Sequence, residues 1–321
     1  MMNNARRVLV LTEADDPTAD LVIEELNDRD VPIARFDTSD FPSSLTVAAD
    51  INGLRNWRGW LRTPTREVDL TAVRSLYYRR PSDFDFSRLE PQQARFAASQ
   101  ARFGLGGLLA DLPGCLYVNH PNAIADAEYK PVQLSVAASV GLRVSPTLIT
   151  NDPEEARAFA RGVGRIIYKP LYLGLHDLDG QPASIWVKEV DLEDLDDSIA
   201  GTMHLFQARC DKVADLRVTV IGDKVFCVKI KTESPDLLDW RYDYDHLSYT
   251  VVEPPAGIVD SMQAYMKRFD LVFGCFDFAV PRNGGPVFLE CNPNGQWGWL
   301  EEATGLPMTA AVADLLQKGT R

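Results

Sequence analysis

Two carboxylates and an amide near the C-terminal end of the chain have the types and spacing of a divalent-cation site. The apolar runs Phe273–Val280 and Val287–Cys291 flank an Arg-Asn-Gly-Gly segment, and this pattern predicts a β-hairpin. Counting residue pairs outward from a four-residue loop sets Asp277 opposite Glu290. Alternate residues of a strand share a face, so Asn292 is expected to point the same way as Glu290.

Opposed carboxylates in a sheet repel each other, so this pattern predicts a positive group between them. Three hard oxygen ligands suit magnesium, which takes one or two protein carboxylates together with substrate phosphates. The same counting sets Ala279 opposite Phe288 and turns Cys291 to the other face, which argues against a soft metal. Because both acids lie within apolar runs, we favour a ligand role over the alternative of solvated strand ends.

Two lysines are candidates to neutralise phosphate groups. Lys169 ends an apolar run, and Lys130 begins a helix just before Pro131. A lysine ammonium is a compact point charge suited to phosphate, although either lysine taken alone also fits a surface residue with a buried stem. The segment 205–210, Leu-Phe-Gln-Ala-Arg-Cys, has the pattern of an edge segment that offers backbone hydrogen bonds and an apolar wall to a purine.

The N-terminal third of the chain predicts an α/β domain. Short apolar strands at residues 7–11, 31–36, 72–78 and 115–118 alternate with helical patterns at 18–29 and 90–111, which favours βαβ units and a parallel sheet. In the second of these helices, the residues expected to form the apolar side include Phe96, Phe103, Leu108 and Leu109.

The rest of the chain predicts a helix at about 126–140 and then mostly strands. Strands are expected at 147–150, 165–168 and 184–190, and a helix begins at the capping pair Asp152 and Pro153. From residue 215 the pattern becomes antiparallel, with strands at 216–221 and 225–230 around a Gly-Asp turn.

Composition excludes several classes of partner. The 321 residues carry a net charge of −13 at pH 7, the opposite sign from a chain that neutralises nucleic acid or an anionic membrane surface. No apolar run approaches the length of a membrane span or a signal-peptide core, so we expect a cytoplasmic protein. The five cysteines include no C-x-x-C pair and are expected to be reduced thiols.

The order of these stretches resembles the ATP-grasp ligases. The matching residues, in chain order, are Lys130, Lys169, Gln207, Asp215-Leu216-Arg217, Asp277 and Glu290-Cys291-Asn292. Three further runs narrow the resemblance: Tyr-Tyr-Arg-Arg-Pro at 77–81, Asp-Trp-Arg-Tyr-Asp-Tyr at 239–244 and Gly-Gln-Trp-Gly-Trp-Leu-Glu at 295–301. Over nearly the whole chain they resemble the graspetide synthetases, in particular the grasp-with-spasm peptide maturases that are relatives of the microviridin macrocyclases.

This resemblance implies an α/β fold in three parts. A Rossmann-like pre-ATP-grasp domain would span residues 1–120, a small central lid subdomain 121–206, and a larger C-terminal antiparallel subdomain 207–321. The cofactors would be ATP and magnesium, with ATP between the last two parts. The resemblance also implies a homodimer.

The resemblance further implies a reaction on a ribosomally made precursor peptide with a leader and an acidic, threonine-rich core. The enzyme would phosphorylate Asp or Glu side chains of that core, and a Thr or Ser hydroxyl or a Lys amine would then close an ester or amide ring. By position, the resemblance implies that Lys130 and Lys169 contact the ATP phosphates, that Gln207, Ala208 and Arg209 form the adenine hinge, and that Asp215 contacts the ribose. It implies that Asp277, Glu290 and Asn292 hold magnesium. Arg217 and Arg241 would contact the acyl phosphate and the substrate carboxylate. Candidate basic contacts to the peptide are Arg79, Arg80, Lys229 and Lys231.

Two features depart from the wider superfamily. Between Leu171 and Gly180 the only glycines are Gly174 and Gly180, where many members have a glycine-rich loop over the phosphates. Lys212 stands where related ligases have an acid for the ribose. Two other functions stay open at this point: a ligase that adds glutamate or another free amino acid, and a nucleotide-binding module without catalysis.

Overall fold

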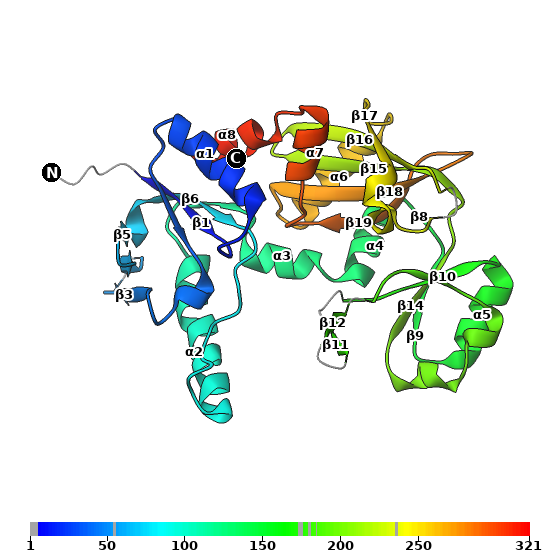
Figure 1. Cartoon of the computed structure of the whole chain (residues 1–321), viewed down its shortest axis with the longest axis horizontal. Helices are drawn as coiled ribbons and strands as arrows, with labels where there is room; N and C mark the ends of the chain where they lie inside the picture. The colour runs from blue at the N-terminus through cyan, green and yellow to red at the C-terminus, as the bar shows by residue number, and fades with distance from the viewer. Residues whose placement is uncertain (1–5, 54–55, 173–175, 179–180, 184, 235–236) are drawn as a thin grey trace.

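The computed structural model describes residues 6–53, 56–172, 176–178, 181–183, 185–234 and 237–321. Three larger sheets organise the molecule, with the N-terminal sheet at the left of Figure 1, a six-stranded sheet at the upper right and a small central sheet at the lower right. Within the part of the chain that the structure describes, no helix combines the length and the apolar character of a membrane span. All five cysteines are free thiols, as expected.

The first sheet is parallel, as predicted. Its strand order is β2 (Ile33–Phe36), β1 (Arg7–Leu11), β6 (Val73–Tyr78) and β7 (Leu116–Val118). Alternate residues of β1 enter different cores, because successive side chains of a strand point to opposite faces. Val8 and Val10 pack in the core that includes α1 (Pro17–Asp28) and α8 (Met308–Lys318), so the C-terminal helix returns to cover the N-terminal sheet.

The other face of the first sheet packs against α2 (Pro91–Ala110) and a small antiparallel sheet. The strands of that small sheet are β3 (Thr46–Asp50), β4 (Arg58–Arg62) and β5 (Glu67–Asp69). The predicted apolar side of α2 is wrong for Phe96 and Phe103, which are 67% and 79% exposed, and right for Leu109, which is buried. The residues that α2 buries are Ala101, Leu105 and Leu109, which follow one another every four positions and form a single stripe.

The second sheet is antiparallel and lies at the lower right of Figure 1, where α5 (Pro153–Val163) covers one face. Its strand order is β13 (Lys188–Val190), β10 (Ile166–Lys169), β14 (His204–Ala208) and β9 (Thr147–Thr150). The prediction of an edge segment at 205–210 is wrong for β14, which is paired on both sides. A short hairpin of β11 (His176–Leu178) and β12 (Gln181–Ala183) follows β10, and Gly174 and Gly180 lie outside the described residues.

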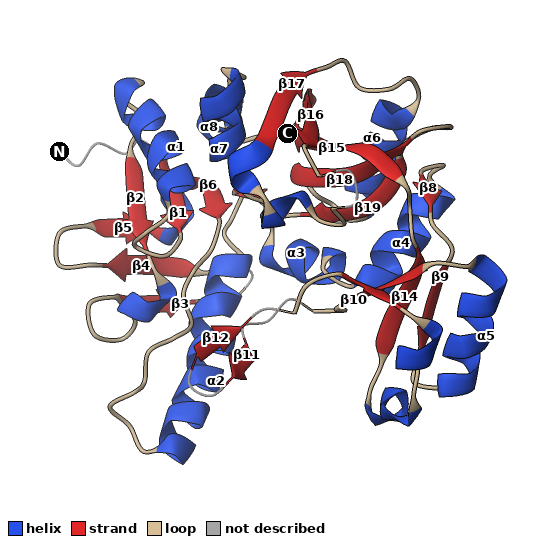
Figure 2. Cartoon of the chain, turned by 45° about the vertical axis from the view of Figure 1, so that its right-hand side comes forward, coloured by secondary structure: helices blue, strands red, loops and turns tan. Residues whose placement is uncertain are grey.

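The third sheet has six strands and is antiparallel except for the pairing of its last two. Its order is β17 (Leu247–Val251), β16 (Lys224–Thr232), β15 (Lys212–Ile221), β18 (Phe273–Pro281), β19 (Val287–Asn292) and β8 (Arg143–Val144). The predicted Gly-Asp turn joins β15 to β16, since Ile221 pairs with Lys224. Figure 2, which colours strands red, shows this sheet above the small central one.

Helices close the third sheet. Helices α4 (Lys130–Ser139) and α6 (Ile258–Arg268) share one core with its aromatic strand residues, and α7 (Gly298–Thr304) packs against β17 and α8. The single helix predicted for 126–140 is in fact two, α3 (Pro121–Ala127) and α4. The break has a local cause, because Pro131 has no backbone N–H and its ring blocks a helix that would run through from α3.

The register of β18 and β19 confirms the pairing on which the predicted cation site depends, because Asp277 pairs with Glu290. Toward the turn, Ala279 pairs with Val287 and not with Phe288, so that part of the prediction is wrong by one residue. The cause is a β-bulge in which β19 carries one extra residue, Leu289. The bulge lets Leu289 and Glu290, although adjacent, both line a cavity between the second and third sheets.

Candidate active site

A cavity of about 200 Å³ is walled by residues of the second and third sheets. The predicted site residues that line it are Lys130, Lys169, Asp215, Arg241, Asp277 and Glu290. A second hollow, lined by Arg209 and Cys210, adjoins it. The side chains common to both hollows are Ile167, Lys212, Asp215, Leu238 and Leu289. The two hollows therefore share part of their lining. We refer to them together as the cleft: its ionic end holds the acids and lysines, and its distal end lies beside Cys210.

The ionic end contains the predicted acid pair. Nη1 of Arg217 donates to Oδ2 of Asp277 at 2.6 Å. Oδ1 of Asp277 is buried and, within the described part of the chain, has no hydrogen-bond partner. Nδ2 of Asn292 lies 3.4 Å from Oδ2 of Asp277 and 3.4 Å from Oε1 of Glu290. The three side chains thus converge, as the hairpin register predicts.

Two lysines complete this charge cluster. Nζ of Lys130 lies 3.5 Å from Oε2 of Glu290. Burial alone would raise the pKa of Glu290, but the ammonium groups of Lys130 and Lys169 lower it to about 2. Burial lowers the pKa of Lys169, and Lys130 adds to that effect while Glu290 opposes it. Burial and the facing Glu290 raise the pKa of Asp277 against the effect of Arg217.

These donors fit magnesium. The unpartnered Oδ1 of Asp277 is a buried oxygen that a cation would satisfy, and Glu290 supplies a second carboxylate. Turning the amide of Asn292 would offer an oxygen in place of its nitrogen. Among the described residues there is no group of three His, Cys, Asp or Glu side chains placed to hold a metal.

The two predicted arginines are held in place by different partners. Arg217 lies on β15 directly opposite Asp277, and its Nη2 donates to the carbonyl oxygen of Gln296 at 3.0 Å. Arg241 lies in a short 3-10 helix, where Asp239 accepts from its Nε at 2.9 Å and from its Nη2 at 2.6 Å. Burial would lower the pKa of Arg241, but Asp239 raises it above its ordinary value. Both guanidinium groups are therefore charged and fixed in direction.

Asp239 holds Arg241 in place, a contact that the sequence did not lead us to expect. Its carboxylate caps the 3-10 helix by accepting from the backbone N–H of Arg241 and also orients the Arg241 side chain. An aspartate two residues before an arginine at the start of a turn was the available signal, since aspartate favours such capping positions.

The predicted adenine hinge is largely committed to the second sheet. The side-chain Nε2 of Gln207 donates to Oγ1 of Thr147 at 2.9 Å. The backbone N–H of Ala208 donates to Pro146, and that of Arg209 donates to Arg165, each at 2.9 Å. An adenine contact at this segment would therefore use its carbonyl oxygens or the backbone of the next residue. The roles assigned to Gln207, Ala208 and Arg209 stay predictions.

The predicted ribose contact is an internal ion pair. Nζ of Lys212 lies 2.8 Å and 2.7 Å from the two carboxylate oxygens of Asp215, and it also donates to the carbonyl oxygen of Leu238. Burial raises the pKa of Asp215 to about 6, although Lys212 acts in the opposite direction. Because both residues line both hollows, a ribose at this point would meet the pair and not an isolated acid.

Of the four basic residues predicted to contact the peptide, Arg79 cannot do so from the surface, because it is buried. It is 2% exposed and lies 3.3 Å from the fully buried carboxylate of Asp16. Arg80 is exposed and lies 3.8 Å from Glu13. Lys229 and Lys231 lie on β16, where Lys229 is half-buried and Lys231 exposed.

Comparison with known proteins decides the family. Residues 7–125 match the MvdD pre-ATP-grasp domain family. The crystal structure of the macrocyclase MdnB from Microcystis aeruginosa is 30% identical in sequence, with a TM-score of 0.81 over 97% of this chain and 99% of that chain. This chain belongs to the ATP-grasp macrocyclase family. The expected fold class is therefore confirmed, with a parallel N-terminal sheet and an antiparallel C-terminal sheet.

Two further structures of this kind are similar over the full length. A RiPP-associated ATP-grasp ligase from Chryseobacterium gregarium, in complex with ADP and with a leader and core peptide, has a TM-score of 0.90 at 23% identity and covers 98% of each chain. The ATP-grasp ligase PsnB, complexed with a minimal precursor, Mg and ADP, has a TM-score of 0.82 at 23% identity over 100% of this chain and 99% of that chain. At this identity they support the shared fold. No curated protein matches this chain significantly in sequence.

Proposed function

We propose that this macrocyclase uses magnesium and ATP to close ester or amide rings in a ribosomally made precursor peptide. The observation that carries the proposal is the placement of Arg217 and Arg241 beside a pair of acids and a pair of lysines. Acids with a cation suit nucleotide phosphates, whereas fixed guanidinium groups suit carboxylate and acyl phosphate oxygens. MdnB, the PsnB complex and the ligase from Chryseobacterium gregarium are consistent with this substrate class.

The proposed binding roles follow from the charges. Lys130 and Lys169 bind the phosphate oxygens of ATP, because they are the ammonium groups beside the acid pair. Asp277, Glu290 and Asn292 would hold magnesium, which when bound neutralises phosphate charge and aligns the transferred group. The nucleoside would extend along the cleft toward Cys210.

The reaction needs no protein nucleophile. A side-chain carboxylate of the peptide attacks the γ-phosphorus of ATP, so a carbon-bound oxygen bonds to phosphorus and ADP leaves. A Thr or Ser hydroxyl, or a Lys amine, of the same peptide then attacks the acyl carbon. Phosphate leaves with the electron pair of the carbon–oxygen bond, the nucleophile loses a proton, and each ring removes one water in total. Arg217 and Arg241 stabilise the negative charge that develops on the acyl phosphate.

The direct test incubates the enzyme with magnesium, ATP and an acidic, threonine-rich precursor peptide with its leader. Mass spectrometry should show the loss of one water per ring together with equal amounts of ADP and phosphate. Arg241→Met should slow ring formation about 100-fold while ADP binds within about twofold of wild type. Arg268→Met, on the exposed side of α6, is the matched control and should leave both unchanged. Peptides that never lose water while ATP is consumed would rule out ring closure.

The alternative ligase is recognised by a different product. An enzyme that adds a free amino acid would increase the mass of its substrate, whereas ring closure decreases it. A nucleotide-binding module without catalysis is disfavoured because the acids, the lysines and both arginines are present together at one cleft.

Three expectations accompany the proposal. We propose a homodimer, which light scattering after size-exclusion chromatography measures directly. We also propose the three-part division at residues 120 and 206, which limited proteolysis probes. The cytoplasmic location expected from the sequence stays a prediction.

A further inference from the structure

A buried arginine connects the N-terminal sheet to the active site. Arg79 directly follows β6, and its guanidinium is almost completely enclosed. Nε of Arg79 lies 3.3 Å from Oδ2 of Asp16, and Nη2 lies 3.5 Å from Oδ1. Asp16 is itself held by the hydroxyl of Thr12 at 2.7 Å and caps α1 by accepting from the N–H of Ala19. One side of the guanidinium is therefore anchored within the N-terminal part.

The other side of the guanidinium binds a loop of the C-terminal part. Nη1 donates to the carbonyl oxygens of Asn294 at 3.3 Å and Gly295 at 3.2 Å. Nη2 donates to Oε1 of Gln296 at 2.7 Å, and Oγ1 of Thr18 donates to the same oxygen at 2.8 Å. A single side chain thus makes hydrogen bonds to three consecutive residues of this loop.

The loop lies against the catalytic groups. It begins just after β19, which ends at Asn292. The carbonyl oxygen of Gln296 accepts from Nη2 of Arg217, and Nη1 of Arg217 binds the carboxylate of Asp277. A Cβ added to Gly295 would lie 2.8 Å from Nη2 of Arg217 and 2.6 Å from Cβ of Cys275, so the loop has no room to shift toward Arg217.

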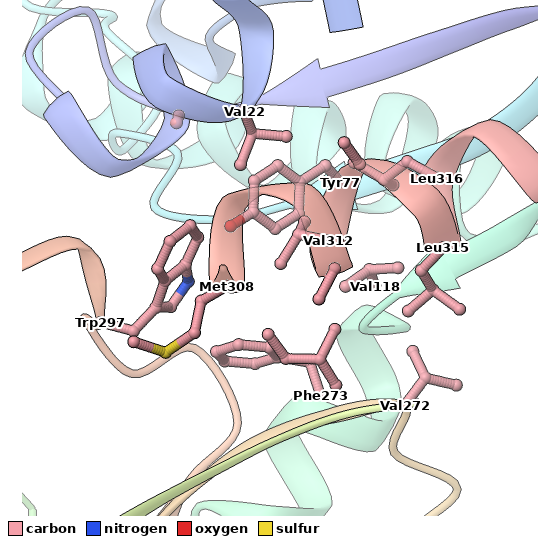
Figure 3. Packing of buried hydrophobic residues seen from close by; sticks show 14 of the residues in the cluster. Val22, Tyr77, Val118, Val272, Phe273, Trp297, Met308, Val312, Leu315 and Leu316 are labelled. Carbon is pink, nitrogen blue, oxygen red and sulfur yellow. The ribbon is translucent and has the colours of Figure 1, made fainter. Parts of the chain in front are cut away.

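An apolar cluster supports the same connection. Figure 3 shows Tyr77 and Trp297 in one cluster with Met308 and Phe273, and these side chains come from the N-terminal sheet, the loop end, α8 and β18. The guanidinium carbon of Arg79 lies 5.7 Å from the ring centre of Tyr77. Trp297 is fully buried, so it fixes the C-terminal end of the loop while Arg79 fixes its middle.

We propose that Arg79 is a positioning residue for catalysis: through the loop 294–296 it holds Arg217, and with it the magnesium ligand Asp277, in the productive arrangement. Stability alone is a weak reason for a buried ion pair, because desolvation offsets most of its Coulomb attraction. Precise positioning of the loop is a better reason for burying this ion pair, since displacement of a catalytic group by about 1 Å lowers the rate about 100-fold. The effect on kcat that we expect from this role rests on the proposed ring closure. The expected effect on magnesium-dependent ADP binding does not.

The test compares Arg79→Met with Arg35→Met. Arg35 lies in the same sheet and makes similar bonds, to Asp20 and to the carbonyl oxygens of Glu13 and Ala14, but all of these lie within the N-terminal part. At a temperature where circular dichroism shows both variants folded, Arg79→Met should lower kcat about 30-fold, with KM for ATP within about threefold of wild type. Arg35→Met should keep both values.

Gln296 offers a second pair of variants that separates positioning from folding. Gln296→Glu keeps the oxygen that accepts from Arg79 and Thr18, and should retain kcat within about threefold. Gln296→Leu removes that oxygen and should lower kcat nearly as much as Arg79→Met. Equal rates for the two Gln296 variants would contradict the proposal.

Two readouts do not depend on the peptide substrate. The magnesium concentration that supports half-maximal binding of fluorescent ADP should rise about tenfold in Arg79→Met, as for other residues that support a metal ligand. Hydrogen exchange of the segment 293–297 should be faster than in Arg35→Met. If neither quantity differs between the two variants, the positioning role is wrong. If wild-type enzyme closes no rings, ring closure fails as the function while these two measurements still judge Arg79.

Discussion

The guanidinium of Arg217 binds one carboxylate oxygen of Asp277 at 2.6 Å, and the other oxygen of Asp277 is buried without a partner among the described residues. We propose that this division gives the carboxylate two functions. One oxygen fixes the position of the acid against β15, and the other is left for a cation. Because the cation and Arg217 then share one carboxylate, a change in either should affect the other.

The acid pair should be required for magnesium. Asp277→Asn and Glu290→Gln keep the shape of each side chain but remove its charge, so we expect kcat to fall at least about 100-fold and the magnesium requirement to rise. Asp223→Asn, in the exposed turn between β15 and β16, is the control. Titration of magnesium at fixed ADP measures the effect. Unchanged magnesium dependence in both variants would place the cation elsewhere.

Lys169 should contribute mainly to ATP binding. Lys169→Met removes an ammonium that is held beside Glu290 and Lys130, so we expect KM for ATP to rise about tenfold. Lys267→Met, on the exposed face of α6, should leave KM unchanged. Initial rates over a range of ATP concentrations distinguish the two. A KM within twofold of wild type for Lys169→Met would assign the phosphate contact to other groups.

The ion pair of Asp16 and Arg79 should make stability depend on pH. Burial would raise the pKa of Asp16, but Arg79 together with hydrogen bonds from Thr12 and the N–H of Ala19 lowers the pKa below its ordinary value of 3.8. A carboxyl with a lowered folded pKa contributes stability above the unfolded pKa, and this contribution is lost as the pH falls through the folded pKa. Asp16→Asn, which keeps a capping oxygen, should cost about 3 kcal/mol at pH 7 and progressively less below about pH 4.

Urea unfolding of wild type and Asp16→Asn at pH 7, 5 and 3 tests that dependence. Asp20→Asn is the control, because its ion pair with Arg35 is half-exposed and should change stability by less than about 1 kcal/mol. A difference between wild type and Asp16→Asn that stays the same at every pH would mean that the charge of Asp16 is not its cause.

Two glycine substitutions should have opposite effects. Gly295→Ala places a methyl group 2.6 Å from Cys275 and 2.8 Å from Arg217, so it should destabilise the protein by about 2 kcal/mol and lower kcat. Gly104→Ala lies within α2, where an added Cβ meets nothing within 4 Å, and should stabilise it by about 0.5–1 kcal/mol. Thermal unfolding measures both. A neutral Gly295→Ala would mean that the loop can move away from Arg217.

The local parts of the fold and the site could be predicted from the chain. The short apolar run of β1 predicts a buried strand, and the hairpin of β18 and β19 brings Asp277 opposite Glu290 within a short stretch of sequence. Such features depend on neighbouring residues and, for the hairpin, on the two-residue period of a strand, and both can be read in the sequence. The bulge at Leu289 could not be predicted from the sequence, because an extra residue in one strand changes the register without changing the apolar pattern.

The contacts between distant segments could not be obtained in that way. From the sequence, Arg79 resembles a surface arginine. In the folded protein it is buried between Asp16 and the loop 294–296, which come from distant parts of the chain. The side on which α2 is buried and the central position of β14 likewise depend on which surfaces meet. Local periodicity fixes what each segment can bury, whereas the free energy of bringing remote segments together selects which partner buries it.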